Sequence, residues 1–323
     1  MASSTLRLVN RSPKQPIKRL PTSVEYPRDA TVEDLKKIIA RQAGVSDFNR
    51  IGLFDPTTKK IIKNRNALIK DQQDVMSTGE LLVKDLGLQL SWRFVFVVEY
   101  LGPLLLHPLL IALRPYIYPT LAFDLPSWWP YSFKNGETTP MTQVQWLVFA
   151  FIFLHFLKRE LETMYLHKFS ANTMPAWNIF RNSFFYWFSA GLVGAYEVYA
   201  PGSLSSRNDL GLLDWVGIAL FFNGEICNYI VHKHLASLRK PGGTERGIPH
   251  CIGSHLVTCP NYMFEVIAWV GIIIVSRSWA IVVFILFGIM YMRDWSKGKE
   301  RSLRQEFGDR YKAKKYTMLP GLI

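Results

Sequence analysis

Six apolar segments between residues 94 and 292 constrain this chain more than any other feature. The mean hydropathy is +0.08 although 20% of residues are charged, so apolar and polar stretches are segregated. Several segments are shorter than the ~20 residues of a spanning helix, which leaves their edges and tilts open. The sequence predicts an all-α multi-pass membrane domain over residues 86–323, with about six to seven transmembrane helices. The segments are residues 94–113, 144–157, 177–199, 212–231, 262–275 and 279–292.

A seventh, interfacial segment is considered near residues 116–129. Four prolines argue against a straight helix there, because proline removes a backbone donor and clashes with the preceding turn. They are Pro115, Pro119, Pro126 and Pro130.

The formal net charge is +13, and the basic residues gather in particular loops. They lie after residue 157, in residues 233–246 and in the tail after Met292, whereas residues 116–140 and 200–210 are nearly neutral. The positive-inside rule then predicts an even number of spans, with both termini and the active site in the cytosol. Next to apolar segments, this charge favours anionic lipid or a phosphate-rich ligand over nucleic acid.

Residues 1–85 carry a different pattern, with short alternating segments and one well-signalled helix. Thr31 is suited to cap that helix and Gly44 to end it. The order of elements resembles a ubiquitin-like α+β domain, which we expect to be a cytosolic scaffold without ubiquitin's conjugation chemistry. No apolar run precedes residue 90, so we expect no cleavable signal peptide. Strands are predicted at residues 4–9, 23–26, 51–54 and 81–84.

Polar residues inside apolar segments are costly and therefore candidates for function. Glu99 lies in the first segment, and Gln89 would share its face if the helix already ran through residue 89. The pair has two interpretations: a buried acid that positions or protonates a ligand, or a structural hydrogen bond between helices.

Asn228 and His232 share one face of a later helix, four residues apart. His232 and His234 lack a third ligand, and Cys227, Cys251 and Cys259 show no metal or disulfide spacing, so we expect no metal.

The turn that follows, residues 238–246, carries Arg239 and Arg246 beside glycines. It is suited either to phosphate groups or to a membrane surface. Tyr262 begins the next apolar segment, either as a proton donor or as an interfacial tyrosine.

Several separate segments, in the right order, resemble the very-long-chain trans-2-enoyl-CoA reductases of the wider steroid 5α-reductase family. The resemblance covers almost the whole chain and includes the N-terminal domain. It is carried by Leu86-Gly-Leu-Gln-Leu-Ser-Trp92, Glu99-Tyr-Leu-Gly-Pro-Leu-Leu105, Leu161-Glu-Thr-Met-Tyr-Leu-His-Lys-Phe-Ser170, Thr173-Met-Pro175, Asn178-Ile-Phe-Arg-Asn182, the Arg239 turn and Val257-Thr-Cys-Pro-Asn-Tyr262.

This resemblance implies NADPH-dependent reduction of the C2–C3 double bond of a trans-2-enoyl-CoA in the endoplasmic reticulum membrane. It implies an acyl-CoA substrate and other enzymes of the fatty acid elongation cycle as partners. Tyr262 is implied as the proton donor, with Glu99 and Gln89 positioning it or the thioester. The implied cofactor-binding residues are Asn228, His232, Arg239, Arg246, Asn261, Arg301 and Tyr311.

The chain departs from the family pattern in places. His232 replaces an acid of the steroid branch, and Tyr311 is placed only within one residue. Leu166 stands where the steroid branch has a tyrosine, which favours Tyr262 as the donor. No G-x-G-x-x-G fingerprint is present, so the cofactor is expected among helices.

Three other functions are considered. They are a steroid or polyprenol double-bond reductase of the same fold, a membrane methyltransferase that uses S-adenosylmethionine, and a non-enzymatic scaffold with a ubiquitin-like adaptor.

Overall fold

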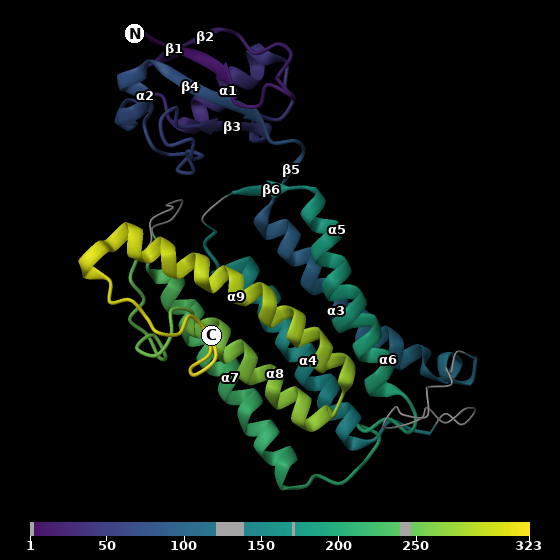
Figure 1. The fold of residues 1–323 in the computed structure, drawn as a ribbon. Helices are drawn as coiled ribbons and strands as arrows, with labels where there is room; N and C mark the ends of the chain where they lie inside the picture. Colours follow the sequence, from purple (N-terminus) through teal and green to yellow (C-terminus); the bar gives the residue numbers. More distant parts are fainter. Residues whose placement is uncertain (1–2, 121–138, 170–171, 240–246) are drawn as a thin grey trace. The chain divides into compact units, whose positions relative to one another are not determined.

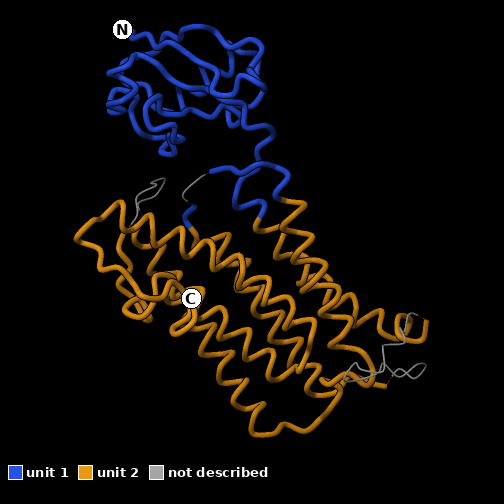
Figure 2. The backbone as a smooth tube through the Cα atoms, viewed as in Figure 1, with its two compact units in different colours: residues 1–95, 168–178, 239–245 blue, residues 96–167, 179–238, 246–323 orange. Residues whose placement is uncertain are grey.

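The fold is described from a computed structural model, which covers residues 3–120, 139–169, 172–239 and 247–323. A small N-terminal sheet is followed by a mostly helical region (Figure 1). The chain divides into two compact units (Figure 2). Unit 1 contains residues 1–95, 168–178 and 239–245, and unit 2 contains residues 96–167, 179–238 and 246–323.

Unit 1 contains a four-stranded sheet in the order β2-β1-β4-β3. The central strands β1 and β4 run parallel, and β2 and β3 flank them antiparallel. The predicted strands are confirmed, each within one residue at either end. Their bounds are β1 Ser3–Asn10, β2 Ser23–Pro27, β3 Ile51–Phe54 and β4 Glu80–Asp85.

Helix α1, Val32–Ala43, begins and ends where local chemistry predicts. The Thr31 hydroxyl accepts a hydrogen bond from Asp34 N at 3.1 Å, and Gly44 takes the left-handed conformation at φ 68°. Leu35 and Ile39 are fully buried in a core shared with the sheet. This unit also contains α2, Gln73–Thr78, and a two-stranded sheet of β5, Gln89–Ser91, and β6, Thr173–Pro175.

Each predicted apolar segment is helical in the structure. The helices are α3 Trp92–Thr120, α4 Gln143–Leu161, α5 Trp177–Ser183, α6 Gly194–Tyr199, α7 Leu212–Ser237, α8 Pro260–Ser276 and α9 Trp279–Phe307. A π-helical segment, Phe184–Val193, joins α5 to α6, and another, Glu162–Leu166, continues α4.

Within the described chain, two helices are long and apolar enough to cross a membrane, Trp92–Thr120 and Trp279–Arg310. Pro260–Ser276 is apolar but shorter. The number of membrane crossings therefore stays a prediction.

Helix α3 corrects one expectation, because it continues through Pro115 and Pro119 to Thr120. Two side chains on its last turns are fastened to the end of α6. Arg114 Nε donates to Tyr199 O at 2.8 Å, and the Tyr118 hydroxyl donates to Tyr196 O at 2.5 Å. These tertiary bonds hold the helix where its prolines disfavour it. Pro126 and Pro130 lie outside the described residues.

Glycines bring α7 and α8 into close contact. A Cβ atom on Gly271 would lie 2.5 Å from Gly217 O and from Phe221 N, and one on Gly224 would lie 2.5 Å from Ala268 N. Only glycine allows two backbones to approach this closely. The contact runs from the N-terminal part of α7 and the C-terminal part of α8 to the middle of both helices, and further along Asn228 Nδ2 donates to Glu265 Oε2 at 3.1 Å.

We expect Gly271→Ala to destabilise the protein by about 1–3 kcal/mol, because the added methyl group forces the helices apart. The measurement is the apparent Tm in detergent. Gly288→Ala on α9 is the matched control, because a Cβ there meets no atom closer than 3.7 Å. Equal apparent Tm values for the two variants would contradict the prediction.

Candidate functional site

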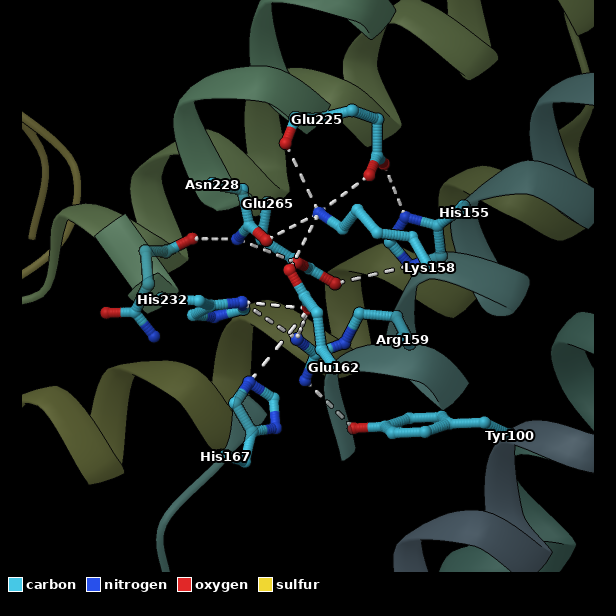
Figure 3. Close-up of polar contacts among 11 residues, drawn as sticks. Tyr100, His155, Lys158, Arg159, Glu162, His167, Glu225, Asn228, His232 and Glu265 are labelled. Carbon is cyan, nitrogen blue, oxygen red and sulfur yellow. Dashed lines mark hydrogen bonds and ion pairs between the residues drawn. The ribbon is translucent and has the colours of Figure 1, made fainter. Parts of the chain in front are cut away.

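Ten polar side chains of unit 2 form a largely buried group, here called the polar cluster (Figure 3). They come from α3, α4, the π-helical segment after α4 and the residue that follows it, α7 and α8. The cluster consists of Tyr100, His155, Lys158, Arg159, Glu162, His167, Glu225, Asn228, His232 and Glu265.

Glu162 is the acceptor around which four of these groups gather. Its Oε2 atom lies 2.9 Å from Arg159 Nη1, 2.9 Å from His232 Nδ1 and 3.9 Å from His167 Nε2. The side chain is 2% exposed, and Oε1 has no hydrogen-bond donor among the described residues. Lys158 Nζ lies 3.8 Å from that Oε1 atom. Glu162 therefore keeps one buried acceptor for a ligand donor.

The other end of the cluster joins α4 to α7 and α8. His155 bridges two carboxylates, with Nδ1 2.6 Å from Glu225 Oε1 and Nε2 3.3 Å from Glu265 Oε1. Lys158 Nζ lies 2.8 Å from Glu225 Oε2 and donates to Asn228 Oδ1 at 2.7 Å. Each cation here already faces a carboxylate, so this interior does not favour an added phosphate.

Arg159 lies at the centre and connects the cluster to α3. Its Nη2 atom donates to the Tyr100 hydroxyl at 3.1 Å, and the guanidinium lies 5.2 Å from that ring's centroid. Tyr262, half-buried near the start of α8, interacts electrostatically with Arg159, Tyr100 and Glu265. The predicted proton donor therefore lies within electrostatic range of both the Arg159 cation and the Glu265 carboxylate.

The two predicted positioning residues have different surroundings. Glu99 is 1% exposed, Asn182 and Tyr100 are close enough to stabilise its charged form, and its Oε2 atom has no partner in the described part of the chain. Gln89 does not continue the helix, because it lies in β5 and α3 begins only at Trp92. Its amide donates to the carbonyl of Leu86 at 3.0 Å, so the predicted shared helical face is wrong.

The structure brings only some of the predicted cofactor residues together. Asn228 and His232 belong to the polar cluster, and Asn261 adds its backbone oxygen, which accepts from Asn228 Nδ2 at 2.8 Å. Arg301 is exposed on α9, and the buried Tyr311 donates to Glu300 Oε2 at 2.5 Å.

Arg239 belongs to unit 1, where its guanidinium donates to the backbone oxygen of Lys168. Arg246 lies outside the described residues.

Sequence reasoning missed the centre of the cluster. Lys158 and Arg159 were interpreted as loop charges, and His155 was hidden in an apolar segment. A signal was available, since Lys158 and Arg159 stand four and three residues before Glu162 on one helical face.

Glu162, His167 and His232 place three ligand atoms within 4.8 Å of one another, as a metal site would. Arg159 Nη1 already lies 3.2 Å from His232 Nδ1 and 2.9 Å from Glu162 Oε2. Burial, and next the charge of Arg159, lower the pKa of His167 to about 3, so this imidazole is neutral at pH 7. Arg159 Nη1 therefore already contacts two of these three side chains.

Known proteins similar to this chain are double-bond reductases. Residues 172–323 match the family described as 3-oxo-5-alpha-steroid 4-dehydrogenase. A very-long-chain enoyl-CoA reductase of Dictyostelium discoideum is 33% identical over 98% of this chain and 99% of its own length. A putative enoyl reductase of Schizosaccharomyces pombe is 32% identical over 94% of this chain and 95% of its own length. A probable very-long-chain enoyl-CoA reductase of Caenorhabditis elegans is 30% identical over 88% of this chain and 89% of its own length.

Proposed function

The chain belongs to the very-long-chain enoyl-CoA reductases, and from this membership we propose that it reduces the C2–C3 double bond of trans-2-enoyl-CoA with NADPH. The reaction is the last step of very-long-chain fatty acid elongation. The observation that carries the proposal is the 33% identity to the Dictyostelium discoideum reductase, which extends over 98% of this chain.

The chemistry requires a hydride at C3 and a proton at C2. NADPH supplies the hydride when bound, and the thioester carbonyl takes up the resulting charge as an enolate. Tyr262 is our proton donor for C2. Arg159, held by Glu162, His232 and Tyr100, supplies a preorganised positive charge within electrostatic range of this phenol. That charge stabilises the phenolate that remains after the proton has left.

The polar cluster fits the uncharged end of a nicotinamide nucleotide. Glu162 Oε1 is a buried acceptor without a donor among the described residues, which suits a carboxamide N–H or a ribose hydroxyl. Asn228 and His232 would hold that end. The resemblance assigns the cofactor's other contacts to Asn261, Arg239, Arg246, Arg301 and Tyr311, and these remain predictions.

We also propose a multi-pass protein of the endoplasmic reticulum membrane, with both termini and the active site in the cytosol. The two long apolar helices and the basic loops support this arrangement. The four-stranded sheet with its single long helix supports a ubiquitin-like unit. We propose other enzymes of the fatty acid elongation cycle as partners of the protein.

The direct test is NADPH oxidation by purified protein in detergent with trans-2-enoyl-CoAs of several lengths. We expect saturated acyl-CoA as the product, and no oxidation when a saturated acyl-CoA replaces the substrate. NADPH should also raise the apparent Tm, because a ligand that binds only the folded state stabilises it. A steroid reduced in place of enoyl-CoA, or stabilisation by S-adenosylmethionine alone, would exclude the proposal.

A further inference from the structure

The outer face of α9 changes from apolar to cationic within one turn. Its exposed side chains recur every three or four residues, so they form one line along the helix, here called the outer stripe. The first four members are apolar, with exposed fractions between 48% and 61%, and two exposed cations follow them. The outer stripe consists of Trp279, Val283, Leu286, Met290, Arg293 and Lys297.

The apolar part of α9 is short for a lipid bilayer. Residues 279–292 extend over about 21 Å of helix, whereas the hydrocarbon core of a bilayer is about 30 Å thick. A short span draws its flanking residues toward the membrane, and the long stems of arginine and lysine let their charged ends reach the headgroups. Arg293 and Lys297 are separated by about 6 Å along the helix, which matches the depth of one headgroup layer.

These two cations are available to an anion from outside the protein. Arg293 Nη1 lies 3.9 Å from Asp294 Oδ1, but the two side chains are 52% and 76% exposed, so solvent weakens the pair. Lys297 has no carboxylate within ion-pair distance in the parts of the chain that the structure describes. The next two cations along α9 differ, since Arg304 Nε lies 2.8 Å from Glu300 Oε1 and Arg301 is a predicted cofactor residue.

The buried face of the same turns is already occupied by the protein itself. Ser296 Oγ lies 2.8 Å from Thr317 Oγ1, and the Tyr311 hydroxyl donates to Glu300 Oε2 at 2.5 Å. These bonds hold the C-terminal segment against α9 without the two exposed cations. The cations of the outer stripe are therefore not required for this packing.

We propose that Arg293 and Lys297 bind the headgroup of an anionic phospholipid in the cytosolic leaflet, with its acyl chains along the apolar part of the outer stripe. The inference rests on the proposed membrane placement and not on the proposed reaction. The cations stand about one helical turn apart, so one phosphate group lies within reach of both. The continuous stripe favours a lipid over an acidic protein or free phosphate, because neither of these needs an apolar surface beside the cations.

The test replaces both cations, Arg293→Gln with Lys297→Gln, and measures lipid binding to the purified full chain in detergent by native mass spectrometry. The probes are phosphatidylserine and phosphatidylcholine with identical acyl chains. We expect the wild type to bind the first phosphatidylserine about 10-fold more tightly than phosphatidylcholine, because each basic residue near the headgroups contributes about fivefold. The double variant should bind both lipids with equal Kd and keep the apparent Tm of the wild type.

Two control variants separate the outer stripe from the net charge. Lys60→Gln with Lys63→Gln removes the same charge from exposed positions of unit 1, and the preference for phosphatidylserine should stay that of the wild type. Asp294→Asn removes the negative charge beside Arg293, so the preference should increase.

Three results would overturn the proposal. They are an unchanged preference in the Arg293 and Lys297 double variant, an equal loss in the Lys60 and Lys63 control, and equal Kd values for the two lipids in the wild type. The last result leaves the proposed membrane placement standing, because both lipids still bind. If the wild type binds neither lipid, the proposed membrane placement fails together with this site.

Discussion

Tyr262→Phe should lower turnover by about 10²-fold or more, the typical contribution of general acid catalysis. The substitution removes one hydroxyl and keeps the ring, which packs against the main helical core. The fold and the affinity for NADPH should therefore survive. Single-turnover reduction of enoyl-CoA measures the rate of the chemical step in which Tyr262 donates its proton. The apparent Tm reports on the fold, and the KM for NADPH reports on cofactor binding.

Tyr165→Phe is the matched control, because Tyr165 is 82% exposed and stands beside the position where the steroid branch has a tyrosine. It should keep near-normal turnover. If Tyr262→Phe also keeps it, proton donation belongs to another group. Tyr100, which Arg159 contacts directly, and Glu99 would then be the next to replace.

Glu162→Gln should destabilise the protein by about 3–5 kcal/mol, because it leaves the buried Arg159 guanidinium without its carboxylate. Arg159 and Lys158 both face Glu162, and His232 lies 2.9 Å from the same carboxylate. Thermal unfolding in detergent, with and without NADPH, measures the loss. NADPH should also protect the variant less, since the displaced Arg159 and His232 belong to the proposed site.

Glu160→Gln provides the comparison two residues away. Glu160 is also buried, at 6% exposed, but its Oε2 atom has no hydrogen-bond partner in the described structure. An amide there removes a buried charge without stranding a cation, so stability should stay the same or rise. If both variants lost the same amount of stability, burial of the carboxylate, and not its pairing with a cation, would explain the destabilisation.

Local signals in the sequence predicted much of the fold. The Thr31 cap and the Gly44 terminus act over a few residues, so α1 could be placed without tertiary information. The alternating strands and the apolar segments were found for the same reason, because their periodicity is written in neighbouring residues. Asn228 and His232 were also predicted together, because one helical face holds both.

Tertiary contacts decided what the local signals left open. Pro115 and Pro119 stay helical because Arg114 and Tyr118 bond to the end of α6, about 80 residues away in sequence. Gln89 turns out to lie in a strand because β6 pairs with it, a partner that no local pattern shows.

The candidate site depends most on such contacts. The sequence presents Lys158 and Arg159 as ordinary basic residues at the end of an apolar segment. They become buried ion-pair partners only because the π-helical segment places Glu162 beside them and α7 supplies Glu225. The sequence determined most of the helical segments and the family that the chain resembles. The packing of α4 and its π-helical extension against α7 and α8 decided which charges meet Glu225, Glu265 and His232, because these pairs join atoms that are distant in sequence and a few ångströms apart in space.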